Sequence, residues 1–269
     1  MKRIGYSIVM CAAGLALAGL AFATPAPNSA KITTRTFDDC PLSDLGTVNS
    51  YPAAITIADT MHAACVGFAN LHSWGFSEDG GATQALFKNG SNFTMCANFK
   101  LDGAGQGEGG LRFGPWWSPA VDGRFMVNVE AGHVPAGEIA CFGGRLPFYS
   151  FTANHSISYV KGTTVFMQMT YTANGLTGAS PATIQYRYTD ASGTYDSPVL
   201  PYDEGSLNPA EAPYGNWGCL HDATVGGYFQ PRANSQAELQ ATWSDICFTS
   251  NDVVPTVPST WGRLKTLYR

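Results

Sequence analysis

The stretch Thr163-Thr164-Val165-Phe166-Met167-Gln168-Met169-Thr170-Tyr171-Thr172 is the clearest β-strand in the chain. Every second residue from Val165 to Tyr171 is apolar, which gives the strand one apolar and one mixed face. The run 182–189 repeats this alternation after a turn, with Ile184, Tyr186 and Tyr188 on one face. The two runs therefore predict an antiparallel hairpin that packs on one side against a core.

Similar short runs recur on both sides of this hairpin, and each is closed by a cluster of Gly, Pro, Asn or Asp. Further strands are expected at 92–101, 109–113, 123–130, 137–142, 225–230 and 238–248. No stretch after the first segment keeps helical periodicity for three turns. About a dozen short strands without helices predict one all-β, antiparallel sandwich or barrel.

Composition excludes several other classes of protein. Charged residues make up 13% of the 269 residues, about half the usual share, and the formal net charge is −5. Coiled coils and helical bundles need more Lys, Glu and Arg than this. Nothing basic is concentrated enough to neutralise phosphates, which excludes nucleic acid as a partner.

The first 23 residues have the pattern of a signal peptide. Met1-Lys2-Arg3 is a basic start, residues 8–22 form an apolar run, and Ala21-Phe22-Ala23 fits the peptidase site. The run is too short for a transmembrane anchor, which needs about 20 apolar residues. We therefore expect cleavage after Ala23 and a protein that is secreted or held at the cell surface.

Six cysteines remain after this cleavage, and an even number in an exported protein predicts up to three disulfides with open connectivity. Zinc is excluded because no two of them are closer than 25 residues. The disulfide candidates are Cys40, Cys65, Cys96, Cys141, Cys219 and Cys247.

Residues 24–36 are expected to be a flexible lead-in, and residues 37–252 the sandwich domain. Residues 253–269 form a Pro-containing linker followed by a short basic tail, with an expected helix at 259–269. This tail is either a surface-attachment signal or a helix that docks back on the sandwich.

The strand order resembles that of concanavalin A-like (laminin-G-like lectin and glucanase) jelly-roll domains over residues 70–249. The similarity lies in the pair 109–113 and 123–127, in the hairpin 161–188, and in 225–230 followed by 239–248. The resemblance implies a jelly-roll sandwich and a function connected with carbohydrates, because the family contains glycan-binding modules, glycoside hydrolases and polysaccharide lyases.

The catalytic patterns of the related enzymes are incomplete here. Glycosidases of this fold resemble one another in a Glu-x-Asp-x-x-Glu strand, which is missing. The lyase patterns are matched only by Tyr228-Phe229-Gln230, which lacks the basic residue. We therefore assign no catalytic residue and expect a non-catalytic carbohydrate-binding or surface-interaction protein. A polysaccharide-degrading enzyme of the same fold and a structural cell-surface protein are the alternatives.

Exposed aromatic and planar polar side chains are the candidates for a glycan site. Gln185 and Arg187 share the mixed face of their strand, which is either an ordinary solvated face or a concave binding face. The full candidate set is Trp116, Trp117, Gln185, Arg187 and Trp217. No cofactor is expected. A structural calcium ion is the alternative to a metal-free protein, with Asp190, Asp196 and the pair Asp203-Glu204 as candidate oxygen donors.

Overall fold

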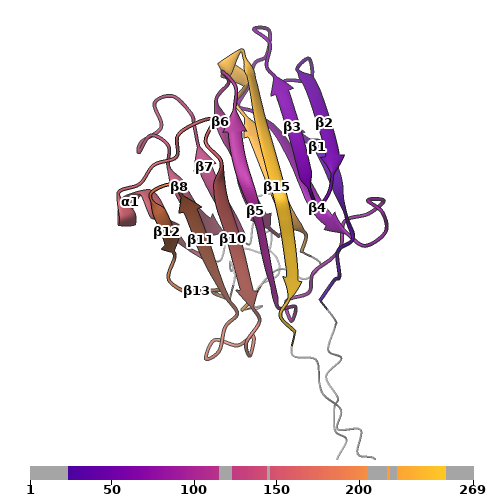
Figure 1. The fold of residues 1–269 in the computed structure, drawn as a ribbon, viewed down its shortest axis with the longest axis vertical. Helices are drawn as coiled ribbons and strands as arrows, with labels where there is room; N and C mark the ends of the chain where they lie inside the picture. The colour runs from indigo at the N-terminus through magenta and orange to yellow at the C-terminus, as the bar shows by residue number, and fades with distance from the viewer. Residues whose placement is uncertain (1–23, 115–122, 144–145, 205–216, 219–222, 253–269) are drawn as a thin grey trace, which may run out of the picture.

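The protein is described by a computed structural model that covers residues 24–114, 123–143, 146–204, 217–218 and 223–252. Figure 1 shows two sheets stacked as layers, and every strand pair in them is antiparallel. This confirms the predicted all-β jelly-roll sandwich. Among the described residues, no helix is long and apolar enough to cross a membrane.

The first sheet has seven strands. Their spatial order is β1 (Ser29–Asp38), β4 (Asn70–Ser77), β14 (Val225–Pro231), β6 (Gly107–Phe113), β7 (Gly123–Asn128), β8 (Ile139–Gly143) and β9 (Leu146–Ser150).

The second sheet has eight strands, and the chain alternates between the two sheets. Its order is β12 (Gly193–Asp196), β11 (Thr183–Asp190), β10 (Val165–Thr172), β5 (Phe93–Asp102), β15 (Glu238–Ser250), β3 (Ala54–Thr60) and β2 (Asp44–Ser50), while β13 (Leu200–Pro201) pairs with β11. A five-residue helix, α1 (Phe151–His155), and a 3-10 turn, η1 (Ala233–Ser235), complete the described structure.

The predicted hairpin is β10 and β11, with Met167 opposite Tyr188 and Met169 opposite Tyr186. These four side chains are buried between the sheets, whereas Arg187 on the other face is exposed. The alternation read from the sequence therefore corresponds to one core face and one solvent face.

Large aromatic side chains fill the space between the sheets. The indole Nε1 of Trp243, on β15, donates to the carbonyl oxygen of Gly110, on β6, at 2.9 Å and so links the two sheets. Trp74 packs edge to face on Trp243, with ring centroids 6.1 Å apart. Both indoles lie over Gly227, where a Cβ would meet their rings. The close approach of two indoles to a strand therefore requires glycine at this position.

A buried polar cluster joins the sheets at one end. Asp59 on β3 and His72 on β4 are fully buried, with 2.8 Å between Asp59 Oδ2 and His72 Nε2. The backbone N–H of Arg35 donates to His72 Nδ1, so the ring proton lies on Nε2 and is donated to Asp59. Asn70 Nδ2 donates to the same carboxylate oxygen at 2.8 Å. This carboxylate is thus held by donors from the opposite sheet.

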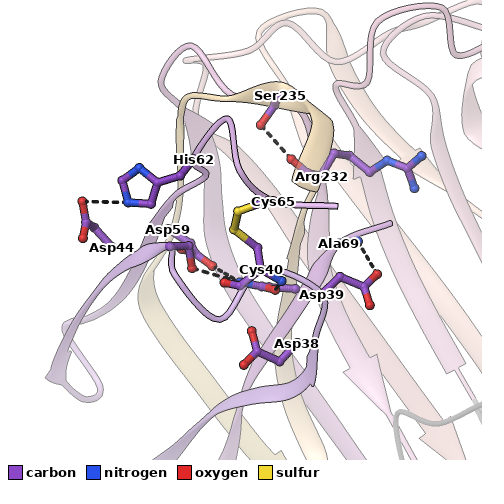
Figure 2. Close-up of a disulfide and its surroundings, with 12 residues drawn as sticks. Asp38, Asp39, Cys40, Asp44, Asp59, His62, Cys65, Ala69, Arg232 and Ser235 are labelled. Carbon is purple, nitrogen blue, oxygen red and sulfur yellow. Dashed lines mark hydrogen bonds and ion pairs between the residues drawn. A yellow bond between two sulfur atoms is a disulfide. The ribbon is translucent and has the colours of Figure 1, made fainter. Parts of the chain in front are cut away.

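The described residues contain two disulfides. Cys40 and Cys65 form the short disulfide beside Asp59 and tie the chain after β1 to the chain after β3 (Figure 2). Cys96 and Cys247 form the long-range disulfide, between facing positions of the neighbouring strands β5 and β15.

The remaining two cysteines do not bear out a third disulfide. Cys141 is buried and unbonded, and it faces the core as an apolar side chain. Cys219 lies outside the described residues.

The expected lead-in at 24–36 is wrong in its second half. Residues from Ser29 onward form β1, an edge strand that pairs with β4 from Ser29 to Asp38. Ala30 is buried in the core and Ile32 packs against it, so even this polar segment contributes apolar side chains to the sandwich. The basic tail, 253–269, lies outside the described residues.

Candidate functional site

Among the described residues, no hydrogen bond or ring contact joins the predicted site residues Gln185, Arg187 and Trp217. Gln185 and Arg187 share the outer face of the eight-stranded sheet, but each is engaged locally. Gln185 Nε2 donates to the carbonyl oxygen of Ser197 at 3.1 Å, and Arg187 forms two bonds with Asp196, at 2.7 and 2.9 Å. Both polar groups thus already have protein partners, and a role in ligand binding stays a prediction for these two residues.

Of the three predicted tryptophans, Trp217 lies within the described residues. Trp217 is half-buried, its ring lies beside Gly178, and its carbonyl accepts from the Ala182 N–H at 2.8 Å. Trp116 and Trp117 lie outside the described residues.

Two of the predicted calcium donors, Asp190 and Asp196, have other partners. Asp190 Oδ1 accepts from the Ser192 backbone N–H at 2.7 Å, which closes the turn between β11 and β12, and Asp196 is paired with Arg187. Within the described ranges, no group of three acidic, His or Cys side chains is placed to hold a metal ion.

The outer face of the seven-stranded sheet carries a different arrangement, which we call the cationic row. Register places one residue from each of six neighbouring strands side by side across this face. From β1 to β8 they are Lys31, Gly75, Gly226, Arg112, Arg124 and Phe142. With strands about 4.8 Å apart, the cationic row is about 24 Å long. Three cations therefore share one line in a chain whose net charge is −5.

A pocket of about 420 Å³ opens along the first half of the cationic row. Its polar lining includes Lys31, Thr33, Ser73, Gln84, Arg112 and Thr224. The two glycines of the cationic row place no side chains between Lys31 and Arg112. The pocket is thus lined by two cations and by side chains that can donate and accept hydrogen bonds.

Gln84 is positioned over Gly75. Its Oε1 accepts from Arg112 Nη2 at 3.3 Å, and its Nε2 donates to Thr33 Oγ1 at 3.2 Å. A Cβ on Gly75 would lie 2.8 Å from Gln84 Cδ, so the amide occupies the space that glycine leaves. A planar amide is therefore held in a fixed orientation in the pocket.

Arg112 is a buried cation, with 4% of its surface exposed. Its Nη1 donates to the carbonyl oxygen of Gly114 and to Thr224 Oγ1, both at 2.8 Å. Its Nε has no partner within the described ranges, and no described carboxylate pairs with it. Burial lowers the pKa of Arg112 to about 10, which leaves it charged at neutral pH. A buried cation with neutral partners attracts an anion strongly.

Arg124, the next cation, is partly neutralised. Its Nη1 pairs with Glu108 Oε1 at 2.8 Å, and the same oxygen accepts from the Tyr228 hydroxyl at 3.3 Å. Burial, and then the nearby Glu108 carboxylate, raise the pKa of Tyr228 well above its ordinary value. Because Tyr228 is fully buried and remains protonated, we assign it a positioning role for Glu108 and Arg124.

Aromatic rings close the far end of the cationic row. The Arg124 guanidinium lies over the Phe142 ring, 4.8 Å from its centroid. Phe148, on the edge strand β9, has its ring 6.2 Å from that of Phe142 and is 61% exposed. This end offers an exposed apolar ring beside a cation.

Sequence reasoning missed the cationic row because its members come from strands far apart along the chain. The sequence does contain a signal for two members. Arg112 and Arg124 each lie within a predicted strand and next to core-type residues, in Leu111-Arg112-Phe113 and in Gly123-Arg124-Phe125. Side chains of opposite faces alternate in such runs, so each arginine had to leave the core.

The known proteins that are similar to this chain were found by structure and not by sequence. No protein-family model matches the chain, and a search of curated proteins found no match. Three similar solved structures are an alginate lyase from Corynebacterium sp., the Emp47p carbohydrate recognition domain and lectin II from Ulex europaeus. Their identities to this chain are 12%, 13% and 9%, and their TM-scores are 0.42, 0.43 and 0.43. The matches cover 82%, 83% and 85% of this chain and 93%, 89% and 96% of those chains.

Proposed function

We propose that this protein is exported and binds a linear acidic polysaccharide across the cationic row. The observation that carries the proposal is the buried Arg112, which has no carboxylate partner within the described residues and lies in a pocket that also holds Lys31. Carboxylate or sulfate groups on a glycan would supply the missing negative charge. Two disulfides and the signal-like first segment support action outside the cytoplasm.

The other features of the cationic row suit a glycan better than a compact anion. The oriented Gln84 amide and the hydroxyls of Thr33, Ser73 and Thr224 match the donors and acceptors of sugar hydroxyls. The exposed Phe148 ring offers the C–H face of a pyranose an apolar surface. We propose that Arg124, beside Phe142, contacts a second acidic group along the polymer.

Binding is tested with polygalacturonate, alginate and chondroitin sulfate, with dextran and laminarin as neutral polymers. Affinity electrophoresis or calorimetry should show binding to acidic polymers that weakens as salt rises. Lys31→Gln removes a half-buried cation and should lower affinity about fivefold, the equivalent of about 1 kcal/mol.

Arg187→Gln is the matched control, because it removes a cation from the outer face of the other sheet. Equal binding to neutral polymers, or no binding to any acidic polymer, would contradict the proposal. A loss with Arg187→Gln, but none with Lys31→Gln, would place the site on the eight-stranded sheet, as the sequence predicted. Weaker binding by Trp116→Ala or Trp117→Ala would add their loop to the site.

The two alternatives have their own readouts in the same material. Release of new reducing ends or unsaturated uronates from a bound polymer would identify a degrading enzyme. Loss of cell-surface attachment on deletion of residues 259–269, with glycan binding absent, would identify a structural surface protein.

A further inference from the structure

The first described residue, Thr24, is fixed in place although it follows the segment predicted to be removed. It is 7% exposed. Its backbone N–H donates to Asp252 Oδ2 at 2.8 Å, and its hydroxyl oxygen accepts from the Asn92 backbone N–H at 3.0 Å. The backbone N–H and the hydroxyl of Thr24 are therefore bound by segments distant in sequence.

Asp252 is placed to hold a cation at this position. It is the second residue after β15, and its Oδ1 accepts from the Asn92 backbone N–H and side-chain Nδ2 at 3.1 and 3.3 Å. Burial raises the pKa of this carboxyl, but hydrogen bonds from Thr24 and Asn92 outweigh that effect and lower it. The carboxylate is thus ionised at neutral pH, and one of its oxygens faces the nitrogen of Thr24.

The sequence places the expected cleavage directly before this nitrogen. Ala21-Phe22-Ala23 has the small residues that a signal peptidase requires, so the scissile bond joins Ala23 to Thr24. Hydrolysis consumes one water and leaves a carboxylate on Ala23 and an ammonium on Thr24. The neutral amide donor that faces Asp252 then becomes a cation.

We propose that signal peptidase cleaves between Ala23 and Thr24, and that the new Thr24 ammonium forms an ion pair with Asp252. The pair ties the beginning of the mature chain to the end of β15, with Asn92 bound to both partners. Because Thr24 is buried in the folded domain, cleavage precedes the docking of this residue. Export processing therefore completes a clasp between the two ends of the sandwich.

Periodate provides a selective test, because it oxidises an N-terminal Thr or Ser that has a free amine and leaves other N-termini intact. The full-length chain is exported, purified and sequenced from its N-terminus. We expect Thr24 first, and oxidation in the folded protein at least about tenfold slower than in denaturant, because amine and hydroxyl are both engaged. A different first residue would overturn the proposal.

Asp252→Asn tests the ion pair itself. It should speed the oxidation of the folded protein and return the pKa of the N-terminal amine to its ordinary value of about 7.7–8, from a raised value in the native chain. Glu78→Gln is the matched control, because Glu78 accepts from the Ala26 N–H at 2.8 Å without bonding Thr24.

An unshifted amine pKa in the unsubstituted protein would refute the ion pair without relying on any variant. Equal oxidation rates in Asp252→Asn and Glu78→Gln would refute it as well. Neither result depends on polysaccharide binding.

Discussion

Gly75 and Gly226 are neighbours in the cationic row, yet we expect alanine to have different effects at the two positions. At Gly75, the new Cβ would lie 2.8 Å from Gln84 Cδ and 3.0 Å from its Oε1, and this side chain can rotate away. At Gly226, the new Cβ would collide with the Trp74 carbonyl oxygen and lie 2.8 Å from the Gly75 Cα. Those atoms are backbone, so β4 and β14 would have to separate.

The magnitudes follow from these contacts. Gly75→Ala breaks the two Gln84 hydrogen bonds, which lowers the free energy of unfolding by about 1 kcal/mol for each bond. Alanine also restricts the unfolded chain, which raises the free energy of unfolding by about 0.4–1 kcal/mol. The net loss in the free energy of unfolding is about 1 kcal/mol. Gly226→Ala forces backbone movement between two strands that pair on both sides, and should cost about 3 kcal/mol or more.

Urea unfolding followed by tryptophan fluorescence measures both values, since Trp74 and Trp243 lie in the core. Gly75→Ala should also weaken binding of polygalacturonate about tenfold, since the methyl group and the displaced amide fill the pocket. Equal destabilisation by the two variants, or a larger loss at Gly75, would refute the reasoning from Cβ contacts.

Three further outcomes are expected. Replacing Cys96 and Cys247 by alanine should lower the free energy of unfolding by about 5 kcal/mol through chain entropy, because the bonded residues are 151 positions apart. The short disulfide, which joins residues 25 positions apart, should contribute about 3.5 kcal/mol, and a larger loss for it in denaturant unfolding would contradict this. Burial raises the pKa of Asp59, but the hydrogen bonds that this carboxylate accepts, first from His72, outweigh burial and lower the pKa from 3.8. The free energy of unfolding should therefore fall as the pH drops below about 4. Asp59→Asn should make this fall shallower in acid titrations, and an unchanged slope would contradict the assignment. Arg187→Ala removes an exposed ion pair and should change the unfolding free energy by less than about 1 kcal/mol, so a larger loss would mean that this pair is structural.

The strands that the sequence predicts most clearly, β10 and β11, have one buried and one solvated face. β10 and β11 were found because their alternation is local and needs no knowledge of the neighbours. β4 was missed because all of its residues are buried, so Asn70, His72 and Trp74 show no alternation of polar and apolar character. The sequence predicts a lead-in over much of β1, because this edge strand, with three Thr residues, Lys31 and Arg35, has little apolar pattern.

The candidate site depended on information that a single sequence does not contain. The cationic row exists because register aligns Lys31 with Gly75, Gly75 with Gly226, and Gly226 with Arg112. Each glycine by itself is typical of a turn or a bulge, and each cation of a solvated surface. Only the pairing of strands distant along the chain places them on one line.

The cationic row crosses the strands at right angles, and the sheet ends at β1 on one side and at β9 on the other. A polymer bound along this line passes both sheet edges, so no chain terminus has to enter the site. Every internal run of repeat units is then an equivalent binding register. The number of registers grows with polymer length. The apparent affinity per polymer chain therefore continues to rise for polymers that are already longer than the cationic row. Long polymers would then carry several protein molecules each.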